Sequence, residues 1–332
     1  MLTTRFSTVF GLQSPIALAP MALTSGGALV AACAQAGTLG LLGGGYGDVA
    51  WVQKEHALAL SLLSHSPGAL SRFGCGFITW RLHEDASALD WLLDQPHTPA
   101  ALMLSFGDPR RYAARIARRG IPLICQIQRI EQLPLCLEAG AAVIVAQGIE
   151  AGGHGMNSLD GRSTVSLVPE MADQLQQRSP STLLLAAGGI ADGRGLAAAL
   201  ALGADGALIG TRFWATKESL ATEAAVKVAL ETSGDATARS PIFDILRRKN
   251  WPNEFNFRAI RNLLHQKWES HMPALMASPE AARHDYDAGV AANDFDRAHI
   301  TVGEAVGLIH DYPAAAELIT RIHQQATQLL SR

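Results

Sequence analysis

Residues 183–213 constrain the fold more than any other segment and read LLLAAGGIADGRGLAAALALGADGALIGTRF. An apolar run leads into Gly188 and Gly189, and a helix made almost entirely of alanine and leucine follows. A second apolar run then ends at Gly210 and Thr211. This order predicts two neighbouring parallel strands joined by a helix. Backbone N–H groups at glycines that follow strand ends are not covered by side chains. The two strand ends therefore predict a cradle for an anion such as a phosphate group.

The same alternation of apolar runs and helical spacing continues through the first two thirds of the chain. Eight runs are predicted to be strands: residues 15–19, 39–43, 73–79, 101–106, 122–127, 142–147, 183–187 and 206–209. Uniformly apolar strands are typical of a parallel sheet that helices cover. Eight such units favour an α/β fold of the closed (β/α)8 type, a TIM barrel. The alternative is an open doubly wound sheet. That fold carries its glycine-rich turn after the first strand, where this chain has Pro20 and Met21.

The pattern changes after the eighth strand. Residues 217–300 combine tryptophan, proline and charge, as in SPIFDILRRKNWPNEFNFRAIRNLLHQKWE, and show no strand pattern. We expect them to form a helical insertion after strand eight that covers the barrel mouth. Residues 301–332 regain helical spacing. The predicted barrel therefore comprises residues 1–216 and 301–332 and closes with a last helix.

Composition restricts the classes of partner. Of 332 residues, 48% are hydrophobic and 17% charged, which is enough for a large core. A net charge of −3 without a basic stripe argues against nucleic acid. No run is long enough to span a bilayer, and the N-terminus lacks the apolar region of a signal peptide. Four cysteines without C-x-x-C spacing predict free thiols in a reducing compartment, so we expect a cytoplasmic protein.

The loop after the sixth strand reads VAQGIEAGGHGMNSLDGR and places His154 among glycines. An imidazole titrates near neutrality, and the carboxyl ends of barrel strands carry catalytic residues. We therefore predict that His154 is the acid–base residue; an exposed loop histidine is the alternative. The loop has no cysteine, and the chain has neither a serine nucleophile elbow nor an H-E-x-x-H motif. A bound cofactor is therefore expected to perform the redox chemistry.

Two glutamines and one apolar turn complete the predicted mouth. Gln126 and Gln147 end strands five and six. An amide both donates and accepts, which suits the pyrimidine edge of a flavin, whereas a polar strand end that meets water is the alternative. Pro20, Met21 and Ala22 end the first strand and can flank a planar ring, with ordinary core packing as the alternative.

Five motifs in this chain resemble those of the nitronate monooxygenase family. They are PIALAPM (15–21), GCGFIT (74–79), AQGIEAGGHG (146–155), AAGGIADGRGLAAALALGADGALIGTRFWATKES (186–219) and IFDILRRKNWP (242–252). They occur in the family's order and extend over most of the chain, although the phosphate-cradle segment alone is shared with many FMN barrels. The resemblance implies an FMN-dependent TIM barrel with a helical insertion. It also implies a small nitronate substrate that is oxidised with dioxygen to a carbonyl compound and nitrite.

The resemblance further implies roles for individual residues. His154 corresponds to the family's active-site base, which acts on a carbon acid. The residues expected to contact FMN are Pro20, Met21 and Ala22 beside the flavin, Gln126 and Gln147 at its ring edge, Gly152 in the histidine loop, and Gly188, Gly189, Gly210 and Thr211 at its phosphate.

Other functions stay open at this point. A related FMN barrel uses NAD(P)H, either as an NADH:quinone reductase or as an enoyl-acyl-carrier-protein reductase. An inosine-phosphate dehydrogenase-like barrel needs a loop cysteine that this chain lacks. A sensor or carrier binds a phosphorylated metabolite without catalysis. The insertion either covers the site or forms a homodimer contact, and Trp251 and Trp268 suit both roles.

Overall fold

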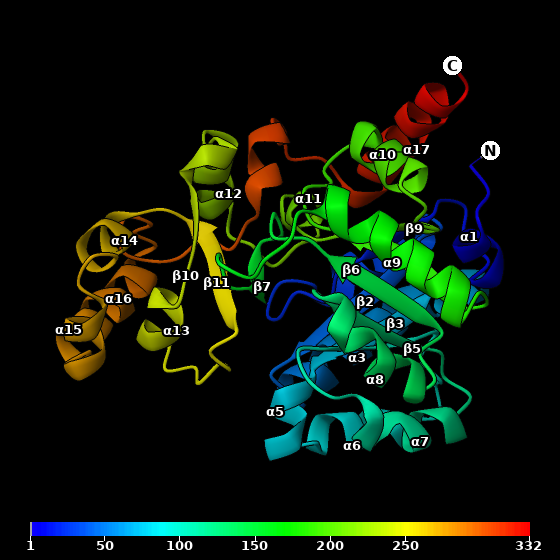
Figure 1. Cartoon of the computed structure of the whole chain (residues 1–332), viewed down its shortest axis with the longest axis horizontal. Helices are drawn as coiled ribbons and strands as arrows, with labels where there is room; N and C mark the ends of the chain where they lie inside the picture. The colour runs from blue at the N-terminus through cyan, green and yellow to red at the C-terminus, as the bar shows by residue number, and fades with distance from the viewer. Residues whose placement is uncertain (1) are drawn as a thin grey trace.

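The computed structural model describes residues 2–332. Eight parallel strands form a closed barrel, in which β1 pairs with both β2 and β9 (Figure 1). The barrel strands are β1 (Ile16–Leu18), β2 (Leu39–Gly45), β3 (Phe73–Ile78), β4 (Leu102–Ser105), β5 (Leu123–Ile127), β6 (Val143–Gln147), β8 (Leu183–Ala187) and β9 (Gly206–Ile209). Each predicted strand overlaps an observed one. The predicted TIM barrel is therefore confirmed, and the open sheet is excluded.

Helices cover the outside of the barrel, so its strands are buried on both faces. Leu102 and Leu104 pack in the layer between sheet and helices, whereas the alternate residues Ala101 and Met103 join a cluster drawn from the strands and from Phe6. That second cluster fills the barrel interior. The helices of this part are α1 (Arg5–Val9), α2 (Gly27–Gln35), α3 (Val49–Leu63), α4 (Pro67–Leu70), α5 (Thr79–Glu84), α6 (Ser87–Leu93), α7 (Arg110–Arg118), η1 (Ile130–Gln132), α8 (Leu133–Glu138), α9 (Thr164–Arg178), α10 (Gly193–Ala201) and α11 (Thr211–Trp214).

The last helix, α17 (Ala315–Leu330), packs against α10 and α2, as expected for the helix that closes the barrel. It begins later than residue 301, because the 3-10 helix η3 (Glu304–Leu308) and Pro313 precede it. A Cβ added to Gly193 in α10 lies 2.5 Å from the amide nitrogen of Ala326. Glycine at this position therefore permits the close contact between α10 and α17.

The segment after β9 is not all-helical, so the expectation of a helical insertion is wrong on this point. It contributes β10 (Thr237–Ser240) and β11 (Phe255–Ile260), and β11 pairs antiparallel with both β10 and β7 (Gly153–Met156). These strands are short and mix polar with apolar residues. The partner β7 comes from the loop after β6, so no local pattern marks the sheet. The helices of this segment are α12 (Glu223–Leu230), η2 (Gly234–Ala236), α13 (Ile242–Leu246), α14 (Leu263–Trp268), α15 (Met272–Ala277) and α16 (Glu280–Ala292).

Figure 1 shows this small sheet, in green and yellow, beside the barrel, with α13 to α16 on its far side. Phe243, Phe257 and Leu275 lie in a separate hydrophobic cluster there.

The four cysteines, Cys33, Cys75, Cys125 and Cys136, are buried free thiols. Within residues 2–332, no helix combines the length and apolar character needed to cross a membrane.

Candidate functional site

The turn after β1 lies close against the next two strands. A Cβ added to Gly43 lies 2.1 Å from the carbonyl oxygen of Met21, and one added to Gly76 lies 2.4 Å from Cγ of Pro20. Glycines in β2 and β3 therefore let the turn approach their backbones. Pro20, Met21 and Ala22 are half-buried, which leaves part of each side chain at the barrel mouth.

The two strand-end glutamines differ in their partners. Gln147 Nε2 donates to the carbonyl oxygen of His154 at 3.1 Å, and its Oε1 accepts from Gln128 Nε2 at 2.9 Å. Gln147 thus supports the histidine loop. The side-chain amide of Gln126, also buried, has no protein partner within residues 2–332. No sequence pattern points to Gln128, whose buried Oε1 has no hydrogen-bond partner within residues 2–332.

The ends of β8 and β9 present unpaired backbone donors. The two strands are neighbours, with Ala187 opposite Leu208. Gly188 and Gly189 have positive φ values of 104° and 73°, a conformation that favours glycine. Within residues 2–332, the backbone amides of Gly188, Gly189, Gly210 and Thr211 donate to no protein acceptor. Such donors suit an anion with several acceptor oxygens.

The loops around these amides are held by their own hydrogen bonds. Thr211 Oγ1 accepts from the amide of Gly303 at 2.9 Å, so this hydroxyl holds the segment before η3. Glu150 lies nearby, and its carboxylate accepts from both the amide and the hydroxyl of Thr164 at 2.9 Å. The half-buried Gly152 packs against Gly303. These contacts fix the β6 loop next to the unpaired amides.

His154 lies on β7, opposite Phe257 of β11. Its Nε2 lies 2.9 and 3.0 Å from the two carboxylate oxygens of Asp244. The imidazole stacks on the indole of Trp251, with ring centroids 3.4 Å apart and planes inclined by 10°. Only 7% of the His154 side chain and 5% of the Asp244 side chain are exposed. His154 is thus a buried, oriented side chain, and the exposed-loop alternative does not hold.

The electrostatics of this pair follow mainly from burial. Burial holds the pKa of His154 well below its usual range, and the nearby Arg247 and Arg239 lower it further. Burial raises the pKa of Asp244 to about 7, although Arg247 opposes this shift. Both shifts disfavour the charged forms, so the imidazole is neutral around neutral pH.

Aromatic residues from separate segments surround the imidazole. Trp251 Nε1 donates to the Tyr46 hydroxyl at 2.9 Å, and Tyr46 follows β2. The ring of Phe106, after β4, lies 5.0 Å from that of Trp251 and 6.4 Å from that of His154. Of these residues, the sequence singles out only Trp251 as suited to cover the site. Asp244 lies in the motif 242–252, for which the sequence alone indicates no role.

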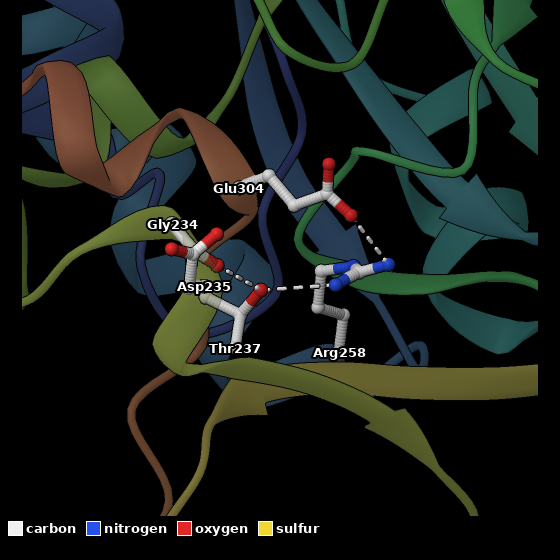
Figure 2. A pocket seen from close by; sticks show the side chains of 5 residues that line it. All are labelled: Gly234, Asp235, Thr237, Arg258 and Glu304. Carbon is white, nitrogen blue, oxygen red and sulfur yellow. Dashed lines mark hydrogen bonds and ion pairs between the residues drawn. The ribbon is translucent and has the colours of Figure 1, made fainter.

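A hollow of about 450 Å³ lies elsewhere (Figure 2). In it, Arg258 Nη2 lies 2.9 Å from Glu304 Oε1, and Nη1 donates to Thr237 Oγ1 at 2.9 Å. Arg258 is paired with Gly153 in the register, whereas Phe257 is paired with His154. Successive strand residues face opposite ways, so the hollow lies on the other face of the small sheet. It is therefore separate from the His154 site.

Comparison with known proteins identifies relatives along almost the whole chain. The family model named Nitronate monooxygenase matches residues 83–325. The chain is 30% identical to a nitronate monooxygenase of Neurospora crassa, over 96% of this chain and 91% of that protein. It is also 30% identical to a nitronate monooxygenase of Pseudomonas aeruginosa, over 97% of this chain and 99% of that protein.

Two solved structures share the architecture. A nitroalkane oxidase from Streptomyces ansochromogenes superposes with a TM-score of 0.77 and 25% identity, covering 98% of this chain and 99% of that one. FabK from Thermotoga maritima superposes with a TM-score of 0.81 and 23% identity, covering 100% and 98%. The likeness to FabK shows the fold alone.

Proposed function

Because the chain belongs to the nitronate monooxygenase family, we propose that it is an FMN-dependent oxidoreductase that oxidises alkyl nitronates with dioxygen to a carbonyl compound and nitrite. The observation that carries this proposal is the set of unpaired amides after β8 and β9, at the same end of the barrel as His154. In TIM barrels this position binds phosphate groups.

The residues present fit FMN. Gly188, Gly189, Gly210 and Thr211 offer amides to its phosphate, and no side chain but that of Thr211 projects from these positions. The flavin ring would lie beside the turn Pro20, Met21 and Ala22, with Gln126 and Gln147 near its polar edge and Gly152 in the adjoining loop. Gln126 has the free amide for this role, whereas Gln147 is already engaged on both of its polar atoms. When bound, FMN supplies the transfer of electrons from the substrate to dioxygen.

The protein residues supply proton transfer and exclude water. A nitronate is already deprotonated, so it needs no base. A neutral nitroalkane must first lose the proton on the carbon next to the nitro group, and His154 is the neutral, buried imidazole placed to accept it. Trp251 and Phe106 cover the imidazole with aromatic surface and keep the site apolar.

The test starts with the visible spectrum of the purified protein and identification of the released chromophore. We expect a flavin spectrum, FMN on release, and anaerobic bleaching by propyl nitronate. Bleaching by NADH alone would favour the reductase alternatives. A colourless protein that resists reconstitution with FMN would contradict the proposal.

Gly210 offers a matched pair of variants for the phosphate contact. A Cβ added here meets its nearest atoms at 3.5 Å, an ordinary distance, and the φ of −108° suits any residue. Gly210→Ala is therefore the steric control for Gly210→Asp, which adds a negative charge beside the amides. We expect FMN affinity to fall at least tenfold further in Gly210→Asp than in Gly210→Ala. Equal affinities would remove these amides from the cofactor site.

A further inference from the structure

The motif IFDILRRKNWP at residues 242–252 has no role so far beyond the cover that Trp251 provides. It forms α13 and the turn that follows, and it brings Asp244 against His154, which lies 90 residues earlier in the chain. Resting on the function proposed above, we propose that Asp244 is a positioning residue that makes Nδ1 of His154, and not Nε2, the proton-accepting atom of the site.

The hydrogen bonds of the imidazole distinguish its two nitrogens. Nε2 lies within 3.0 Å of both carboxylate oxygens of Asp244. Nδ1 has no protein hydrogen-bond partner within residues 2–332. It is also not fully buried, since it is absent from the set of fully buried polar atoms without a partner. Nδ1 is therefore the nitrogen left for a ligand, and Asp244 occupies the other.

The residues around His154 prevent its imidazole ring from flipping by about 180°, which would interchange the positions of Nδ1 and Nε2. The backbone of His154 is held by strand pairing with Phe257 and by the bond from Gln147 to its carbonyl oxygen. The ring lies between the indole of Trp251, 3.4 Å away, and the ring of Phe257, 4.9 Å away. A flip would break the bonds to Asp244 inside a packed, desolvated space.

The position of the imidazole proton also makes Nδ1 the proton-accepting nitrogen. When Asp244 is ionised, its carboxylate accepts the one proton of the neutral imidazole from Nε2, so Nδ1 keeps its lone pair. In the reaction step, the C–H bond of a neutral nitroalkane breaks, its electron pair stays on the nitronate, and the proton passes to Nδ1. The Asp244 carboxylate then balances the imidazolium charge.

Several other charged or titratable groups face this pair. Arg247 Nη1 lies 3.8 Å from Asp244 Oδ1 on the same helical segment. Arg239 of β10, a strand that β11 separates from β7, also acts on the charge of His154. His299, hydrogen-bonded to the Tyr286 hydroxyl at 2.7 Å, lies on the side of Phe257. Burial lowers the pKa of His299 to about 3. His299 is therefore neutral at working pH and does not replace Asp244 as the counter-charge.

Asp244→Asn tests the inference through a split between two substrates. The amide of asparagine donates to Nε2 and so moves the imidazole proton to Nδ1, which removes the lone pair that accepts the substrate proton. We expect kcat/KM for neutral nitroethane to fall by ~10²–10⁴, as for loss of a general base, and kcat/KM for ethyl nitronate to change by less than about tenfold. Asp244→Glu should restore part of the activity on nitroethane.

Asp287→Asn is the matched control, because Asp287 is an exposed acid of the same segment whose one ion-pair partner within residues 2–332 is Arg248. It should leave both activities unchanged. An Asp244→Asn enzyme with the wild-type ratio of the two activities would overturn the inference. So would equal loss on both substrates with normal FMN content.

A second measurement does not depend on activity. Long-range ¹H–¹⁵N spectra of the labelled wild-type protein, with His154→Asn to assign the signals, should show Nδ1 of His154 unprotonated and Nε2 protonated. A protonated Nδ1 in the wild type would overturn the inference even if Asp244→Asn fails to fold. If the spectra are as expected but the protein does not oxidise nitronates, the proposed function is refuted and the assignment of the His154 nitrogens stands.

Discussion

The indole of Trp251 lies flat on the imidazole of His154, with ring centroids 3.4 Å apart and an interplanar angle of 10°. A hydrogen bond of 2.9 Å to the Tyr46 hydroxyl holds the indole, and Phe106 meets its edge. The indole thus covers one face of the imidazole, and residues from two other segments hold it in place. This cover explains why burial is the main cause of the low pKa of His154.

Replacing Trp251 with alanine should raise the pKa of His154, because it lets water reach the imidazole. The base acts only when unprotonated, so activity on a neutral nitroalkane is lost as the pH falls through this pKa. The acid limb of the kcat/KM profile should therefore move to higher pH in Trp251→Ala. Trp251→Phe keeps an aromatic face and should stay close to the wild type. An acid limb unchanged in Trp251→Ala would show that the stack does not set this pKa.

His154→Asn should separate the two forms of the substrate. Loss of a general base lowers a rate by ~10²–10⁴, and only the neutral nitroalkane needs one. We expect turnover of nitroethane to be nearly abolished and turnover of ethyl nitronate to be spared more, with both rates measured at equal FMN content. Wild-type rates on nitroethane would exclude His154 from the reaction.

The barrel could be predicted from the sequence because each of its strands is a local signal. A run such as residues 183–187 is apolar throughout, since it is buried on both faces. The small sheet gave no such signal. Thr237–Ser240 and Gly153–Met156 have four residues each, and their pairing through β11 joins segments about a hundred residues apart. Pairing over such distances depends on the assembled fold.

The candidate site divides in the same way. His154 could be predicted because a histidine among glycines follows a barrel strand, and the strand-end glycines because they follow two others. Asp244 could not be placed, because its approach to His154 depends on β11 and α13. The roles of Gln126 and Gln147 at the flavin stay predictions. The bonds of Gln147 to His154 and Gln128 show a structural role that strand position alone did not indicate.

Arg239 should contribute strongly to stability. Its buried guanidinium donates to the carbonyl oxygens of Ile149, Ala151, Gly153 and Asn256, so it ties the β6 loop to the small sheet. Arg239→Met leaves these buried acceptors unpaired and should lower the free energy of unfolding by about 3 kcal/mol. The exposed Arg248, changed to methionine, should cost no more than about 0.5 kcal/mol. Urea unfolding of both variants, at equal FMN content, measures the difference.

Gly76 should be intolerant of even a methyl group. A Cβ there lies 2.4 Å from Cγ of Pro20 and 3.3 Å from Cβ of Met103, inside a fully buried strand. Gly76→Ala should therefore displace the turn Pro20–Met21, cost about 1–3 kcal/mol of stability and weaken FMN binding. Gly68, in α4, has nothing within 4 Å of an added Cβ, so Gly68→Ala should be neutral or stabilising by up to about 1 kcal/mol. Thermal unfolding and FMN titration of both variants test the steric argument. Full FMN affinity in Gly76→Ala would show that the turn after β1 does not border the flavin.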